Sequence, residues 1–192
     1  MELKNKKIIL ASASPRRRQI LKNAGYDFDI VISDYDEDII AQKFSDELVE
    51  NCAYQKALDV YNKMADKSNK LIISADTVVV LDDIILGKPI DKNDAFKMLK
   101  NLSSKTHFVA TSICLLSTDK IIKATKKTKV SFRELSDDEI IDYIDSKKPY
   151  DKAGAYGIQD ENFDFVLNVE GELNNVIGFP LELFKEKIAL IN

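Results

Sequence analysis

Three consecutive arginines, Arg16 to Arg18, are the residues of this chain whose type and position most directly suggest chemistry. They follow Ser14-Pro15, a pair typical of a helix cap and first helical position, directly after the apolar run 8–12. The unpaired backbone N–H groups of a helix N-terminus attract anions, and guanidinium groups bind phosphate oxygens two at a time. Cations here oppose the helix dipole, so a merely solvated helix start is the less favoured interpretation. The pattern therefore predicts a phosphate site.

Helical geometry predicts where the three arginine side chains point. Successive residues of a helix are rotated by about 100°, so the three side chains cannot all face one ligand. We expect Arg16 and Arg17 to face a cleft and Arg18 to face solvent or an acidic neighbour. The hydroxyl groups of Ser12 and Ser14 add donors at the same turn.

Asp76 interrupts the otherwise apolar run 71–81, which predicts a buried strand. A carboxylate in such a strand is costly unless it is paired, hydrogen-bonded or bound to a metal. Asp76 is therefore the leading candidate for a catalytic or metal-binding group, and a structural salt bridge is the alternative. Lys56 lies on the apolar stripe of a predicted helix; it either extends its ammonium to water or reaches a phosphate site. Lys88, in the turn Gly87-Lys88-Pro89, is a weaker signal.

The remaining polar candidates are less specific. Asp36, Glu37 and Asp38 could ligate a hard cation, although a solvated acidic loop is favoured for at least two of them. The only histidine, His107, has no companion ligand, so we expect it to be structural. The two cysteines, Cys52 and Cys114, lack metal or redox spacing and are expected to be buried, reduced thiols.

Strand and helix patterns alternate along the chain, which predicts an α/β fold with a mixed sheet. A tight hairpin is expected at Asp82-Asp83, and a capping box at Ser136 and Glu139. Strands are predicted at 8–12, 28–32, 71–81, 84–86, 108–116, 120–132 and 163–169, and helices at 15–25, 46–65, 91–102, 136–146 and from Pro180 onward.

Length and composition limit the possible classes of protein. At 192 residues the chain fits a single domain or two lobes around one cleft, and its net charge of −4 argues against general nucleic-acid binding. The first apolar run is too brief for a signal peptide, and no window approaches the ~18 apolar residues of a membrane span. We therefore expect a cytoplasmic protein with no membrane partner.

Six segments in this order and spacing resemble the Maf family of nucleoside triphosphate pyrophosphatases, also called septum-formation proteins. Each segment alone is weakly specific, but together they extend from Leu10 to Leu181. The segments are 12–17 (SASPRR), 56–57 (KA), 74–79 (SADTVV), 87–89 (GKP), 151–159 (DKAGAYGIQ) and 175–180 (NVIGFP).

The resemblance implies an elongated mixed sheet with flanking helices, a single Maf-like domain over 1–192 with two lobes around a central cleft, and a homodimer. It implies hydrolysis of dTTP and UTP to the nucleoside monophosphate and pyrophosphate with a divalent metal cation, Mg²⁺ or Mn²⁺. Asp76 would activate water, and Glu37 and Asp76 would bind the metal. The residues that would hold phosphates are Ser12, Arg17, Lys56 and Lys88, and those that would set base preference are Arg16, Thr77 and Gln159.

The chemistry of Gln159 agrees with a pyrimidine preference, because an amide can pair with the imide edge of uracil or thymine. Glutamine also pairs with adenine, so this agreement is partial. The alternatives are a broad-specificity pyrophosphatase for modified nucleotides and a nucleotide-binding regulator of cell division without turnover; an RNA-binding module fits poorly. Ser112 and Phe179 depart from the family's usual glycine and leucine; neither is expected to touch the chemistry, and a tighter cleft floor is the alternative.

Overall fold

The computed structural model describes residues 6–36 and 39–191, in which a seven-stranded mixed sheet is flanked by helices. The sheet has the order β2-β1-β3-β5-β6-β7, with β4 paired to β3. The strands are β1 (Lys7–Leu10), β2 (Asp29–Ile30), β3 (Lys70–Leu81), β4 (Ile84–Leu86), β5 (Thr106–Leu116), β6 (Ile121–Phe132) and β7 (Val166–Glu170). The helices are α1 (Pro15–Asn23), α2 (Asp46–Lys63), α3 (Lys92–Leu102), α4 (Asp137–Lys147), α5 (Leu173–Ile177) and α6 (Leu181–Ile188), with 3-10 turns η1 (Ala153–Ala155) and η2 (Ala189–Ile191).

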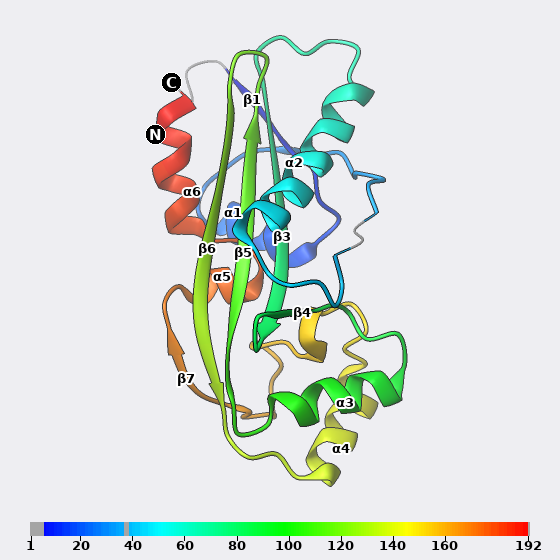
Figure 1. Ribbon diagram of the computed structural model, residues 1–192. Coiled ribbons are helices and arrows are strands. Elements are labelled where there is room, and N and C mark those ends of the chain that lie inside the picture. Colours follow the sequence, from blue (N-terminus) through cyan, green and yellow to red (C-terminus); the bar gives the residue numbers. More distant parts are fainter. Residues whose placement is uncertain (1–5, 37–38, 192) are drawn as a thin grey trace.

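The long antiparallel strands β3, β5 and β6 run the length of the molecule and make it elongated (Figure 1). β1 pairs in parallel with the first residues of β3, from Lys70 to Ile73, and β4 pairs with its last residues, from Val79 to Leu81. Within the described residues, no strand pairs with this edge of β3 between Ser74 and Val78. The sheet therefore has a gap in the middle of one edge.

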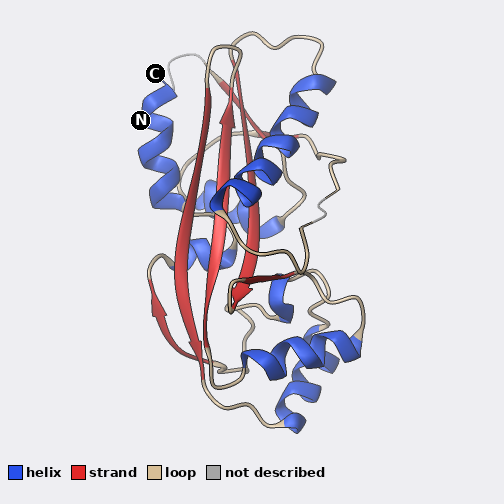
Figure 2. Ribbon diagram, in the orientation of Figure 1, coloured by secondary structure: helices blue, strands red, loops and turns tan. Residues whose placement is uncertain are grey.

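Separate apolar clusters lie at the two ends of the sheet. At the end formed by β1, helices α1 and α6 lie on one face with α2 on the other, and Leu21, Phe179 and Phe184 belong to the core (Figure 2). At the opposite end, α3, α4 and η1 enclose a second core that includes Leu99 and Tyr143. The predicted α/β class with a mixed sheet and two lobes is confirmed, whereas the extent of one domain over 1–192 stays a prediction.

Several local predictions are confirmed by the backbone. Ser14 caps α1 by accepting a hydrogen bond from the Arg17 N–H, and the chain leaves the helix through Gly25 at φ +81°. Asp82 and Asp83 have φ values of 52° and 65°, as a two-residue hairpin with right-handed strand twist requires. The capping box that opens α4 is formed by both of its bonds.

The structure differs from the sequence expectation in the shorter elements. β2 has two residues instead of five, and β7 begins at Val166 instead of Phe163, whose ring packs against Tyr143. α5 was not predicted, since it has five residues and no side-chain cap at its N-terminus. No helix in residues 6–36 or 39–191 combines the length and the apolar character needed to cross a bilayer.

Candidate functional site

A cleft of about 700 Å³ opens at the gap in the edge of β3. Its walls come from both lobes: the start of α1 and part of α2 on one side, and the segment 151–160 on the other. Glu37 lies outside the described residues. All the other predicted site residues line this one cleft, namely Ser12, Arg16, Arg17, Lys56, Asp76, Thr77, Lys88 and Gln159.

Arg17 connects three elements at the centre of the cleft. Its Nε donates to Gly178 O (2.9 Å), and its Nη1 donates to Ala75 O (2.8 Å) and Ser12 Oγ (3.2 Å). Its Nη2 donates to Thr77 Oγ1 at 3.0 Å. A guanidinium group has five N–H donors, so most of this group's capacity serves protein oxygens. Arg17 therefore fixes α1 against β3 and the end of α5 in addition to bringing a positive charge to the cleft.

The hydroxyl group of Thr77 belongs to a chain of hydrogen bonds with a fixed direction. Thr111 Oγ1 donates to Asn175 O (2.9 Å), so its single proton is committed there. The 3.0 Å bond between the two threonine hydroxyls is therefore donated by Thr77, whose oxygen also accepts from Arg17. Its contact with Gly178 O is longer, at 3.4 Å. Thr77 thus directs its proton toward Thr111.

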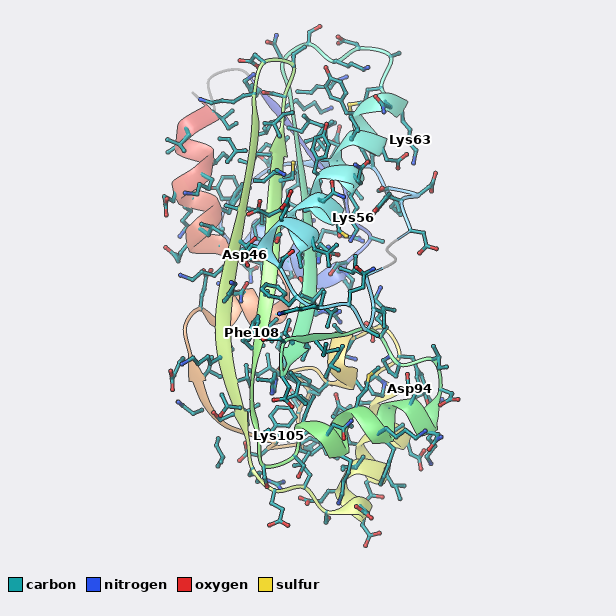
Figure 3. All side chains as sticks on the ribbon, in the orientation of Figure 1. Asp46, Lys56, Lys63, Asp94, Lys105 and Phe108 are labelled. Atoms are coloured by element: carbon teal, nitrogen blue, oxygen red, sulfur yellow. The ribbon has the colours of Figure 1, made fainter. Side chains whose placement is uncertain are left out.

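Asp76 and Lys56 meet beside this chain but on the other face of β3, because successive side chains of a strand alternate. Lys56 Nζ lies 2.6 Å from Asp76 Oδ1, and the two side chains are 11% and 2% exposed. Lys56 extends from the middle of α2 toward the sheet (Figure 3). The interpretation that Lys56 reaches past the core to water is therefore wrong, because its ammonium binds the carboxylate inside the cleft.

Arg16, Lys88 and Gln159 lie at the margin of the cleft. Arg16 Nη1 reaches Asp151 Oδ2 (3.0 Å) in the opposite wall. Burial alone would raise the pKa of Asp151, but hydrogen bonds from its lysine neighbour and from Arg16 hold that pKa below its usual value. Lys88 and Gln159 are exposed. Arg18 turns back from the helix surface and donates to Ala13 O (3.2 Å).

A sequence model described as Maf-like protein matches residues 7–190. The chain belongs to the Maf family. Three similar proteins carry the name dTTP/UTP pyrophosphatase. The one from Acetivibrio thermocellus is 48% identical, with 91% of this chain and 90% of that protein covered. One from Clostridium botulinum is 47% identical (93% and 96% covered), and one from Bacillus cereus is 41% identical (97% and 91% covered). A solved structure of the Staphylococcus aureus Ham1 protein has a TM-score of 0.41 and 17% identity, covering 69% of this chain and 73% of that one.

The two departures from the usual Maf pattern lie next to lining residues of the cleft, because Ser112 pairs with Asp76 across β3 and β5 and Phe179 follows Gly178. The Ser112 hydroxyl bonds to Thr125 Oγ1 (2.8 Å), and Phe179 packs its ring against Phe184 in the core. Among the described residues that line the cleft, neither departure is present. Neither side chain therefore lines the cleft, whereas the alternative of a tighter cleft floor stays a prediction.

The histidine and the cysteines of this Maf protein are structural, as expected. His107 is 3% exposed and its Nε2 lies 2.8 Å from the Tyr156 hydroxyl. Burial lowers the pKa of His107 to about 4, so it is neutral near pH 7. Cys52 and Cys114 are buried and unbridged, and burial raises the pKa of Cys114 to about 12.

Sequence reasoning assigned no role to the residues that support the cleft from behind, of which Thr111 and Asn175, the first residue of the segment 175–180, are the clearest. The Asn175 side chain is fully buried, and its Nδ2 donates to Val109 O (2.9 Å) and Thr128 Oγ1 (3.0 Å). Thr111 lies directly opposite Thr77 in the β3–β5 pair. For Thr111, the available signal was a polar residue in an apolar strand, but its partner depends on a strand register that the sequence did not specify.

Proposed function

We propose that this Maf-family protein hydrolyses dTTP and UTP between the α and β phosphates, giving the nucleoside monophosphate and pyrophosphate. One observation carries the proposal: a buried carboxylate, Asp76, lies in a single cleft together with the cationic side chains Arg17 and Lys56. A triphosphate needs cations along its chain, and hydrolysis needs a base beside the phosphorus that is attacked. The names of the relatives support the choice of substrate.

In this proposal Asp76 takes the proton of the attacking water. The ammonium of Lys56, 2.6 Å from Oδ1, favours the ionised carboxylate and adds positive charge where the transition state gains negative charge. Ser12 and the Arg16 N–H at the start of α1 bind phosphate oxygens, and Lys88 does so from the opposite lobe. Arg17 binds the phosphates directly, and it also positions the other phosphate ligands because it holds α1 against β3 and the end of α5.

A divalent cation, Mg²⁺ or Mn²⁺, fits the donors of the cleft. Mg²⁺ takes one or two carboxylates and completes its shell with phosphate oxygens and water, and Asp76 supplies such a carboxylate. The described residues contain no cluster of three His, Cys, Asp or Glu side chains, so the substrate would supply much of the shell. A bound cation would neutralise phosphate oxygens and lower the pKa of water. The role of Glu37 as a metal ligand stays a prediction.

Base preference is assigned to the margin of the cleft. Gln159 presents an amide there, and Arg16 adds donors from the other lobe. Thr77 stays in the set with a changed role, because its proton points toward Thr111 and its oxygen accepts from Arg17. We propose that Thr77 acts through the position of Arg17 and not by donating to the base.

The proposal also covers the protein's surroundings: a cytoplasmic homodimer that does not bind nucleic acid. The net charge of −4 supports the last point, because nucleic-acid binding relies on a positive surface. Exposed apolar side chains near one sheet edge, Leu167 (70% exposed) and Leu173 (51%), support self-association. Sedimentation of the pure protein tests the dimer, and a single monomeric species at micromolar concentration would contradict it.

A substrate panel with product identification tests the reaction. The pure protein is incubated with Mg²⁺ and dTTP, UTP, CTP, a purine triphosphate or a triphosphate with a modified base; we expect pyrophosphate from dTTP and UTP. Asp76→Asn should lose roughly 10²–10⁴-fold in kcat, the range for loss of a general base, whereas the exposed control Asp142→Asn should keep full activity. Orthophosphate as product refutes the reaction type. Equal rates on modified bases favour the broad-specificity enzyme, and tight binding without product over hours favours the regulator.

A further inference from the structure

Gln159 is carried by a four-residue turn at the margin of the cleft. The turn is closed by the bond from Asp160 N to Gly157 O (3.0 Å), and Gln159 is its third residue. The glutamine side chain is exposed, so the turn backbone, and not surrounding packing, determines the point from which it reaches the cleft. Whatever holds the turn therefore limits where that amide can lie.

One buried hydroxyl group binds both ends of this turn. Tyr143 Oη accepts from Gly157 N at 2.9 Å and donates to Asp160 Oδ2 at 2.5 Å. A phenol has one proton to donate and lone pairs that accept, so the two bonds use it in both senses. No other described contact reaches the first and last residues of the turn with a single atom.

The hydroxyl is itself held in place by its helix and its ring. Tyr143 belongs to α4, which begins with a complete capping box, and its side chain is 1% exposed. The ring packs edge-on against Phe163 and Phe165, with centroids 4.9 and 5.0 Å away. Burial and the bond to Asp160 raise the pKa of Tyr143, so the donated proton is present at any physiological pH.

Gly157 provides the close approach that the arrangement requires. A Cβ atom there would lie 2.8 Å from Asp160 Oδ2 and 2.9 Å from Lys152 Cε. A larger residue would push the carboxylate away from the tyrosine hydroxyl. The glycine, the aspartate and the tyrosine thus form one unit, although Tyr143 lies on α4, 14 residues before Gly157.

We propose that Tyr143 is a positioning residue that sets base selectivity by holding the turn that presents Gln159 to the substrate. The proposal rests on the proposed function, in which that amide contacts the base. Among the described residues that line the cleft, Tyr143 is absent, so it acts through the turn and not by touching substrate. An amide discriminates uracil from cytosine only when its position relative to the base is fixed, because a displaced or rotated amide can satisfy either edge.

The first measurement is hydrogen exchange of the Gly157 amide by NMR, which needs no substrate. Tyr143→Phe removes the hydroxyl and keeps the ring, and Tyr150→Phe, on a tyrosine that is 39% exposed, is the matched control. We expect the Gly157 amide to exchange about tenfold faster or more in Tyr143→Phe and unchanged in the control. Asp160→Asn keeps an oxygen that can accept the phenol proton, so it should change exchange little. Unchanged exchange in Tyr143→Phe would overturn the proposal.

The second measurement is the ratio of kcat/KM for UTP over CTP. We expect Tyr143→Phe to reduce this ratio at least fivefold, mainly by raising KM for UTP, and Asp160→Asn to retain most of it. Asp160→Ala removes the acceptor alone and should fall between them; it also serves if Tyr143→Phe does not fold. If the Gly157 amide exchanges faster in Tyr143→Phe but the UTP over CTP ratio is unchanged, the role of Tyr143 is overturned and the proposed function is not. A wild-type enzyme that does not discriminate, or does not turn over, overturns the proposed function as well.

Discussion

The ion pair between Lys56 and Asp76 yields the sharpest prediction of stability. Replacing Lys56 by Met keeps most of the side-chain volume and leaves the Asp76 carboxylate, 2% exposed, without its ammonium neighbour at 2.6 Å. Removing one partner of a buried pair costs about 3–5 kcal/mol, because the other charge stays buried. The pair borders the cleft, from which water can solvate the carboxylate, so we expect a value near 3 kcal/mol. A loss of that size lowers the Tm by roughly 6–12 °C for a chain of this length.

The companion variants determine whether the cost comes from the Asp76 carboxylate that has lost the Lys56 ammonium. Asp76→Asn should cost less than Lys56→Met, because the flexible lysine can move its ammonium toward the cleft. The double variant removes both charges, so it should recover about 2 kcal/mol relative to the sum of the single variants. Lys63→Met is the control: the same helix carries this lysine two turns on (Figure 3), its side chain is 35% exposed, and its loss should cost clearly less than the loss of Lys56 because water screens its ion pairs.

Urea unfolding followed by circular dichroism at pH 7 provides the free energies, with equal m-values as the check on two-state behaviour. Activity is measured in parallel, and the double variant should remain inactive although it recovers part of the lost stability. If Lys56→Met costs no more than Lys63→Met, the buried pair contributes nothing beyond an exposed one, and the reasoning from burial is refuted. If the double variant turns over substrate, Asp76 is not the base.

Three further perturbations test other parts of the structure. Thr111→Val removes a hydroxyl from the chain that positions Arg17 and should lower kcat/KM about tenfold, whereas Thr111→Ser should restore it; equal loss in both would indicate a packing effect. His107 is held neutral by burial, with its pKa lowered from 6.5 to about 4, so its contribution to stability is complete above pH 6.5 and is lost as pH falls. Urea unfolding should show roughly 3 kcal/mol lost between pH 7 and 4 beyond the loss in His107→Phe. Gly87→Ala would place a Cβ 2.5 Å from the Ile40 side chain and should cost about 1–3 kcal/mol in thermal unfolding; an unchanged Tm would contradict that contact.

Local signals were sufficient for the elements that carry the site. Ser14-Pro15 specifies where α1 begins, and the apolar run around Asp76 specifies β3, because capping and burial act within a few residues. All eight predicted site residues that the structure describes line one cleft. The order of the quoted segments and their resemblance to the Maf family indicated that these residues form one site; hydrophobic periodicity did not.

The supporting residues could not be predicted, because their roles depend on what lies opposite them. Thr111 matters through its register with Thr77, and Tyr143 matters because α4 brings its hydroxyl to a distant turn. For Lys56 the helical pattern specified a buried face but not the acid that this face meets. Sequence patterns describe one element at a time, whereas these contacts arise between elements that only tertiary packing brings together.

The gap in the edge of β3 explains why one ligand could reach both halves of the site. Neighbouring residues of a covered strand point to opposite faces of a sheet, so the sheet itself would separate Asp76 from Thr77. Here β1 and β4 pair with the two ends of β3 and leave its middle open, so a ligand at the edge can contact both faces. An open edge leaves backbone oxygens that need donors, and Arg17 donates to one of them, Ala75 O. A lysine at position 17 lacks the planar fork of donors, so it could not donate to Ala75 O, Gly178 O and Thr77 at the same time. The guanidinium that brings charge to the cleft therefore also stabilises the open edge.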